Sequence, residues 1–268
     1  MQCRAFPERA VLCWERQLRV EDNGYIGGVI AGLVYFVAGY RMLRLSFKTK
    51  KSPERLLGAM FLFWSISYLF WYLGLAVDET PLATPLMAVE NITDQAGQIA
   101  LALFLRLVFR RDERWAAWLT AVMVGAIALG VVGSACVGDW EGIRPLSNPW
   151  YPLLNVHLVV TFWLTAEGIR HYRMARQRLR LDLCKPMDCN RYLLWALFGL
   201  FQVCSSLVIV VLYAGYEAEQ SFAFGFDLVL CSFEILTALM VWLAFCAPKL
   251  YRNWIAEGAS SATSQTGS

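Results

Sequence analysis

The chain contains seven stretches of about 20 mainly apolar residues, and these constrain its fold more than any other feature. They are Tyr25–Leu45, Leu56–Val77, Met87–Phe109, Trp115–Val137, Pro152–Ile169, Tyr192–Tyr213 and Phe222–Phe245. A helix of that length crosses the hydrocarbon core of a bilayer. Because 58% of all residues are hydrophobic and only 17% are charged, a disordered chain is excluded and the composition argues against a soluble enzyme. We predict an all-α polytopic membrane protein, a seven-transmembrane helix bundle over residues 24–256.

The third stretch is the most polar of the seven. Its first half contains Glu90, Asn91, Asp94, Gln95 and Gln98, whereas Ile99–Phe109 is strongly apolar. Omitting this stretch would place two basic loops on opposite sides of the membrane, so we count it as a span.

Basic residues predict the orientation of the bundle. They lie in the loops after the first, third and fifth stretches and after the seventh, within Arg41–Arg55, Arg106–Arg114, Arg170–Arg191 and Lys249–Arg252. The alternate loops are acidic, with Asp78, Glu79, Asp139, Glu141, Glu217 and Glu219. Since Lys and Arg are enriched in cytoplasmic loops, we expect the N-terminus outside and the C-terminus in the cytoplasm.

The two ends of the chain lie outside the predicted bundle. We expect residues 1–23 to form an extracytoplasmic segment, since they lack the apolar core of a signal peptide. Pro7–Val20 is either a short amphipathic helix at the interface or part of an unstructured tail with a misassigned start. Residues 257–268 are predicted to be a disordered cytoplasmic tail, because Ser260–Ser268 is rich in Ser, Thr and Gly.

Polar residues of the third stretch are candidate ligand contacts. Glu90, Asp94 and Gln98 follow the spacing i, i+4, i+8, and Asn91 lies beside them on the same broad helical face. Asp94 would lie about 14 Å along a helix that begins at Pro85. Carboxylates are costly in hydrocarbon, so this face should point into the bundle or a water-filled vestibule. The alternative is that the helix begins near Gln95, leaving Glu90 and Asn91 in a solvated loop.

Four further polar residues lie within the other stretches. His157 and Asp227 fall in the outer half, and we group them with the ligand contacts. Gln202 and Glu234 lie near the middle of their stretches, where they predict a polar core or proton relay. Glu234 would be either protonated or hydrated, and a hydrogen bond to a neighbouring helix is the alternative role. Because a lone His with scattered carboxylates does not fit a zinc site, no metal and no cofactor are expected.

The order of these parts resembles that of a known signalling family. Arg55-Leu-Leu-Gly-Ala-Met-Phe-Leu-Phe-Trp-Ser-Ile-Ser-Tyr-Leu opens the second stretch, a polar third stretch follows, and Ala247-Pro-Lys-Leu-Tyr-Arg-Asn-Trp follows the seventh. Over residues 24–256 this resembles the N-terminal seven-transmembrane input region of bacterial sensor histidine kinases, without the kinase. The resemblance implies an input module that signals through a partner, and it assigns no functional residue.

These observations predict a receptor-like membrane sensor. A membrane-embedded enzyme that uses Asp94 and Glu234 as acid and base stays an alternative, although no recognisable motif supports it. The sensor would bind a small polar or cationic ligand, or protons, between the third, fifth and seventh spans. The Arg170–Arg191 loop would bind a cytoplasmic signalling protein or anionic lipid. Alternatively, its basic residues only fix the orientation. The alternative is a small-solute or proton transporter or channel with a polar path through Asp94 and Glu234, although no internal repeat supports it.

Partners and location follow from the same pattern. We expect contact with the lipid bilayer, location in the bacterial inner (cell) membrane, and no nucleic-acid binding, since the net charge is only +3. Gly28-x-x-x-Gly32 predicts close helix packing, either within the chain or in a homo-oligomer.

Overall fold

The computed structural model describes residues 7–77, 80–138, 140, 150, 153, 156–181, 183–217 and 223–255, and side chains from 26 to 210 and from 228 to 255 within these ranges. All regular structure in this described part is helical. The helices are α1 (Pro7–Thr49), α2 (Ser52–Ala76), α3 (Ala83–Phe109), α4 (Arg114–Val137), α6 (His157–Leu179), α7 (Pro186–Glu217) and α8 (Ala223–Phe245). A short helical segment follows at 249–255.

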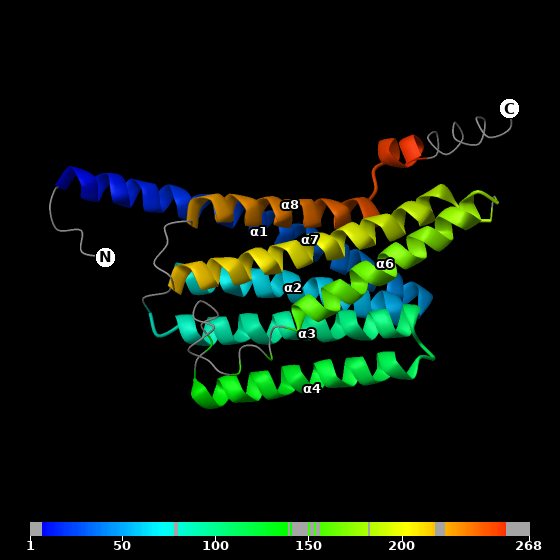
Figure 1. The fold of residues 1–268 in the computed structure, drawn as a ribbon, viewed down its shortest axis with the longest axis horizontal. Helices are drawn as coiled ribbons and strands as arrows, with labels where there is room; N and C mark the ends of the chain where they lie inside the picture. Colours follow the sequence, from blue (N-terminus) through cyan, green and yellow to red (C-terminus); the bar gives the residue numbers. More distant parts are fainter. Residues whose placement is uncertain are drawn as a thin grey trace.

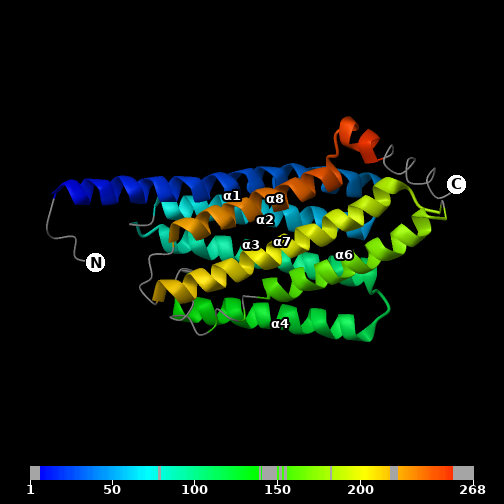
Figure 2. The same cartoon turned by 45° about the horizontal axis from the view of Figure 1, so that its top comes forward.

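The helices lie side by side and alternate in direction (Figures 1 and 2). As a result, the α1–α2, α3–α4 and α6–α7 connections and the C-terminal segment share one end of the bundle. We call this the basic end, because the predicted basic loops gather there. The start of α1 and the α2–α3 connection lie at the opposite end. α4 packs against α3 at one edge of the bundle.

Among the described residues, six helices are long and apolar enough to cross a membrane: α1 (from Ile26), α2, α3, α4, α7 and α8. The polar third stretch is among them. α6 is not, because Glu167, Arg170 and Arg173 follow its short apolar part within the same helix. Large apolar side chains such as Phe36, Trp118 and Phe162 are exposed on the outer faces, which suits contact with lipid. The protein is therefore a multi-pass integral membrane protein, and the seventh crossing is not shown.

Several helices differ in extent from the predicted stretches, and α1 and α3 decide between alternatives that the sequence left open. α1 begins at Pro7 and continues without a break through the first apolar stretch, so part of the predicted N-terminal segment is helical. α3 begins at Ala83, with Pro85 in its first turn, where a missing backbone N–H costs no helical hydrogen bond. The alternative start near Gln95 is therefore wrong, and Glu90 lies within the helix.

The paired glycines of α1 lie against α2. A side chain at Gly28 would collide with the ring of Tyr72, and a Cβ at Gly32 would lie 3.4 Å from the Cβ of Tyr68. Small residues let two helices approach closely. The motif thus serves packing within the chain.

An aromatic layer fills the bundle toward its basic end. It consists of Phe61, Phe104, Trp195, Phe198 and Phe245, which come from α2, α3, α7 and α8. Ring centroids of successive members lie 5.5–6.3 Å apart, at distances typical of edge-to-face and stacked aromatic pairs. Along α2, α3, α7 and α8, these rings lie between the polar residues described next and the basic end.

Candidate functional site: a buried polar cluster

The first polar residues of α3 bind neighbouring segments. Ser67 of α2 donates a hydrogen bond to Glu90 over 3.1 Å. The Asn91 amide donates to the other Glu90 oxygen over 2.9 Å and to the backbone carbonyl of Trp140 over 3.2 Å. Both α3 side chains are partly buried. Glu90 and Asn91 therefore join α3 to α2 and to the chain beyond α4.

One turn further along α3, Asp94 accepts two hydrogen bonds. The Gln98 amide donates to it over 2.6 Å, and the Gln95 amide donates over 3.3 Å. Gln98 is 2% exposed and Gln95 is 5% exposed. The carbonyl oxygens of both glutamines have no hydrogen-bond partner among the described residues. The site thus offers a carboxylate and two unused amide acceptors.

His157 continues the polar interior from α6. Its Nε2 lies 3.1 Å from the Oε1 atom of Gln202 on α7, and because an amide oxygen can only accept, the ring donates from Nε2. The Gln202 amide in turn donates to the Tyr35 hydroxyl of α1 over 3.2 Å. Asp94 and His157 also interact electrostatically. Four helices thus meet through this chain of contacts.

Glu234 enters from α8. Its carboxyl group lies near Tyr68 of α2, whose ring lies 6.0 Å from that of Tyr35. No Lys or Arg forms an ion pair with Glu234 among the described residues. Glu234 therefore lies beside a tyrosine and has no positively charged partner in the described part of the chain.

Trp64 lies at the centre of this arrangement. Its ring centroid is 5.9 Å from that of His157 and 5.9 Å from that of Tyr35. A Cβ on Gly97 would lie 2.7 Å from Trp64 Nε1, so the indole packs directly against the backbone of α3. Gly97 lies between Asp94 and Gln98 in the sequence. Trp64 is 3% exposed, and its N–H has no partner in the described structure.

We call these residues the polar cluster: Tyr35, Trp64, Tyr68, Asp94, Gln98, His157, Gln202 and Glu234. A buried polar atom without a partner costs about 1–3 kcal/mol, so such atoms commonly hold water or a ligand. The cluster contains one unused donor and, with Gln95, two unused acceptors. Its chemistry suits a small ligand that carries positive charge or hydrogen-bond donors.

The structure brings together five of the eight residues predicted from sequence: Asp94, Gln98, His157, Gln202 and Glu234. Glu90 and Asn91 lie nearer the start of α3 and contact other partners. The side chain of Asp227 lies outside the described residues.

Sequence reasoning missed the aromatic members Tyr35 and Trp64, and it interpreted Tyr68 only as a residue that hydrogen bonds between helices. Tyr35 was detectable in principle, because interfacial tyrosines belong at the ends of a span and this one lies in the middle.

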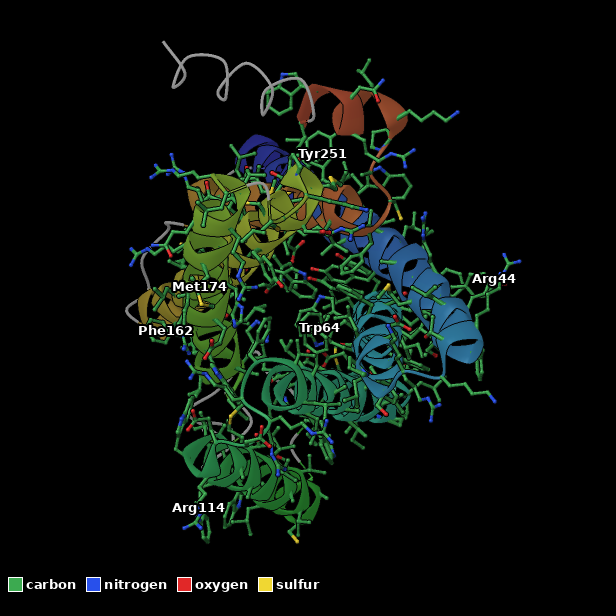
Figure 3. The ribbon with its side chains drawn as sticks, turned by 90° about the vertical axis from the view of Figure 1, so that its right-hand side faces the viewer. Arg44, Trp64, Arg114, Phe162, Met174 and Tyr251 are labelled. Atoms are coloured by element: carbon green, nitrogen blue, oxygen red, sulfur yellow. The ribbon has the colours of Figure 1, made fainter. Side chains whose placement is uncertain are left out.

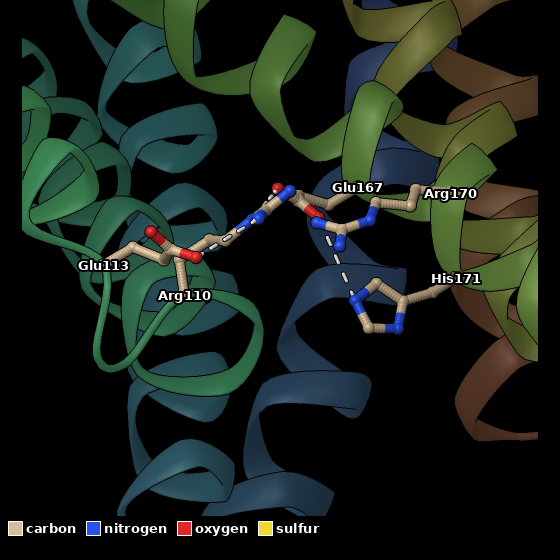
Figure 4. A network of polar contacts seen from close by, with 5 residues as sticks. All are labelled: Arg110, Glu113, Glu167, Arg170 and His171. Atoms are coloured by element: carbon tan, nitrogen blue, oxygen red, sulfur yellow. Dashed lines mark hydrogen bonds and ion pairs between the residues drawn. The ribbon is translucent and has the colours of Figure 1, made fainter.

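A second polar group lies toward the basic end (Figure 4). Glu167 of α6, which is 3% exposed, accepts a hydrogen bond from Arg110 Nε over 2.5 Å. Arg170 and His171 each lie 3.9 Å from its other oxygen, and Glu113 lies 4.0 Å from Arg110. This ion-pair group links the end of α3 to α6. In the sequence, this group was indicated by one acidic residue, Glu167, just before the basic Arg170–Arg191 loop.

His171 extends the ion-pair group to α7. Its ring centroid is 4.6 Å from that of Phe109 and 5.4 Å from that of Tyr192. Partial burial lowers the pKa of His171, as do the nearby arginines, while Glu167 opposes the shift. The imidazole is thus favoured in its neutral form between two rings.

Comparisons with protein-family models, with curated proteins and with solved structures found no match to this chain. The resemblance to sensor input regions therefore stays a prediction. Any functional assignment rests on the geometry of the polar cluster and of the helices that carry it.

Proposed function

We propose that this protein is a receptor-like membrane sensor that binds a small polar or cationic ligand, or protons, in the polar cluster. The observation that supports this most is the convergence of buried and partly buried polar side chains from α1, α2, α3, α6, α7 and α8, with three atoms unpartnered among the described residues. Asp94 and Glu234 would attract a cation, and the faces of Trp64 and Tyr35 would favour it further.

The position of the aromatic layer favours sensing over transport. Phe245 lies 11 residues after Glu234 on α8, and Phe198 lies one turn from Gln202 on α7 toward the basic end. Their packed rings interpose apolar bulk between the polar cluster and the ion-pair group. A transporter or channel, the second candidate, would need a polar path through this layer. Asp94 and Glu234 belong instead to one cluster on one side of it.

We further propose seven crossings, with the N-terminus outside and the C-terminus in the cytoplasm of a bacterial inner membrane. The alternating helix directions support this, because α6 runs antiparallel to α7 within the same bundle (Figure 2). The collection of basic loops at one end agrees with a cytoplasmic location for that end.

α6 is the element that would transmit a signal. It carries His157 of the polar cluster and Glu167 of the ion-pair group, about 15 Å apart along the helix axis. A ligand that binds His157 would move α6 relative to α3 and thereby change the Arg110–Glu167 contact. The Arg170–Arg191 segment follows directly, and we propose that it binds a cytoplasmic signalling protein.

A titration in proteoliposomes tests this proposal. Tryptophan fluorescence of the full chain is followed against tetramethylammonium and against pH, while proton and cation flux are measured in the same vesicles. We expect a saturable fluorescence change without flux. Asp94→Asn should abolish it, and Asp112→Asn, a matched change at an exposed position on the basic end, should not.

Two outcomes contradict the proposal. Flux through the wild type that Asp94→Asn abolishes would favour transport. A response that is equal in both variants would remove the polar cluster from the function. Trp64→Phe identifies the reporting ring, with Trp118→Phe, which is 72% exposed, as its control.

A further inference from the structure

A cavity lies at the basic end, away from the polar cluster. Its volume is about 550 Å³, which is within the range of small-molecule sites. It is lined by residues of α1, of the first turns of α2 and α7, and of the end of α8: Arg41, Met42, Arg44, Leu45, Lys48, Glu54, Arg191 and Phe245. Figure 3 looks onto this end of the bundle, with Arg44 labelled at the outer side.

Three of the cations come from one face of α1. Arg41, Arg44 and Lys48 follow the spacing i, i+3, i+7, which places them in successive turns of the same helical surface. All three side chains are exposed, and no ion pair involves any of them among the described residues. Their positive charge is therefore not neutralised within the described part of the chain.

The other charged residues of the cavity do not neutralise most of this positive charge. Arg191 lies 3.4 Å from Asp188, but both side chains are about half exposed, so the pair is weak. Glu54 is the one acid of the lining, and its carboxylate accepts a hydrogen bond from Thr49. The cavity thus presents four basic residues against one acid that already has a partner.

The apolar part of the lining indicates what kind of anion fits. Met42, Leu45 and Phe245 contribute hydrocarbon beside the basic residues. The cavity lies in the last turns of the membrane-crossing part of α1, Ile26–Thr49, which is the depth of lipid headgroups. A ligand that fills it carries an anionic phosphate and an apolar portion. Basic pockets between transmembrane helices at this depth suit anionic lipid headgroups.

We infer that the cavity bounded by Arg41, Arg44, Lys48 and Arg191 is a binding site for an anionic phospholipid. The phosphate lies among the four basic side chains, and the glycerol and acyl portion lies against Met42, Leu45 and Phe245. This inference does not depend on the function proposed for the polar cluster.

Lipid retention measured by native mass spectrometry tests the site. The full chain in detergent is offered phosphatidylglycerol, the zwitterionic phosphatidylcholine, or inorganic phosphate alone. We expect phosphatidylglycerol to be retained on the order of 10-fold more strongly than phosphatidylcholine. Equal retention of the two lipids overturns the inference. Displacement of phosphatidylglycerol by inorganic phosphate at equal concentration shows a soluble-anion site and overturns the lipid assignment.

Two triple variants with the same change in net charge locate the site. Arg41→Gln with Arg44→Gln and Lys48→Gln should abolish the preference for phosphatidylglycerol. Arg111→Gln with Arg114→Gln and Lys249→Gln removes the same charge from exposed positions outside the cavity and should retain the preference. Loss in both variants would mean a diffuse charge effect and would overturn the site.

A neutral variant tests the cavity even if the triple variant does not fold. Leu45 is 41% exposed and lines the cavity, so Leu45→Trp fills it without changing charge. We expect it to reduce retention of phosphatidylglycerol. Leu250→Trp, at a position 83% exposed, is the control and should leave retention unchanged. Full retention in Leu45→Trp would overturn the inference.

Discussion

Arg110 at the end of α3 donates from Nε to Glu167 of α6 over 2.5 Å, and this partly buried contact joins two residues that are 57 positions apart in the chain. Glu113 contacts the same arginine at 4.0 Å but is 54% exposed. The two acids therefore offer a matched pair of substitutions around one cation.

Glu167→Gln should destabilise the protein far more than Glu113→Gln. Removing one partner of a buried ion pair leaves the other charge uncompensated and costs about 3–5 kcal/mol, with the lower value expected here because Arg110 is 18% exposed. An exposed pair contributes about 1 kcal/mol or less. The free energy of unfolding of both variants in detergent checks this. Similar losses of stability would contradict the prediction that the buried pair contributes more than the exposed one.

His171 should make the protein less stable in acid. Burial lowers its pKa in the folded state, as do Arg170, Arg110 and Arg178, while Glu167 opposes them. The unfolded chain then binds more protons below about pH 6.5, so stability falls as pH drops through that value toward the lower folded pKa. His171→Gln should reduce the loss measured between about pH 8 and about pH 5. An unchanged pH profile would contradict this.

Gly97→Ala should disturb the centre of the polar cluster. The added Cβ would lie 2.6 Å from the indole Cδ1 of Trp64, whose ring is held by its neighbours. Overpacking of this kind costs about 1–3 kcal/mol. Gly125→Ala in α4 meets nothing within 4 Å, so it should be neutral or stabilise the helix by about 0.5–1 kcal/mol. The unfolding temperature should fall in Gly97→Ala and should stay the same or rise in Gly125→Ala.

Reporter fusions should place the basic end in the cytoplasm. A reporter inserted at Leu183, in the α6–α7 connection, and one after Ser268 should both be active on the cytoplasmic side. A reporter at Thr80, between α2 and α3, should be active on the outer side. If Leu183 and Thr80 report the same side, α6 and its neighbours do not form the proposed seven crossings.

The sequence alone determined the apolar part of each helix and which loops share an end of the bundle. Long apolar stretches form helices in a membrane because every backbone polar group must be satisfied within the segment. The same argument placed Asp94 and Gln98 inside the bundle, since a carboxylate cannot face lipid cheaply. The fifth stretch was harder to assign as a membrane span, because its apolar part is short and Glu167 and Arg170 follow it within one helix.

Only the tertiary structure decided which side chains meet. Tyr35, Trp64 and Tyr68 look like ordinary aromatic residues of apolar helices in the sequence, and they become members of the polar cluster through their neighbours. The same holds for the Arg110–Glu167 pair and for the basic cavity. Hydrophobicity and charge are local properties that set helix formation and depth. The rotation of each helix, and hence its contacts, depends on packing between residues far apart in the chain.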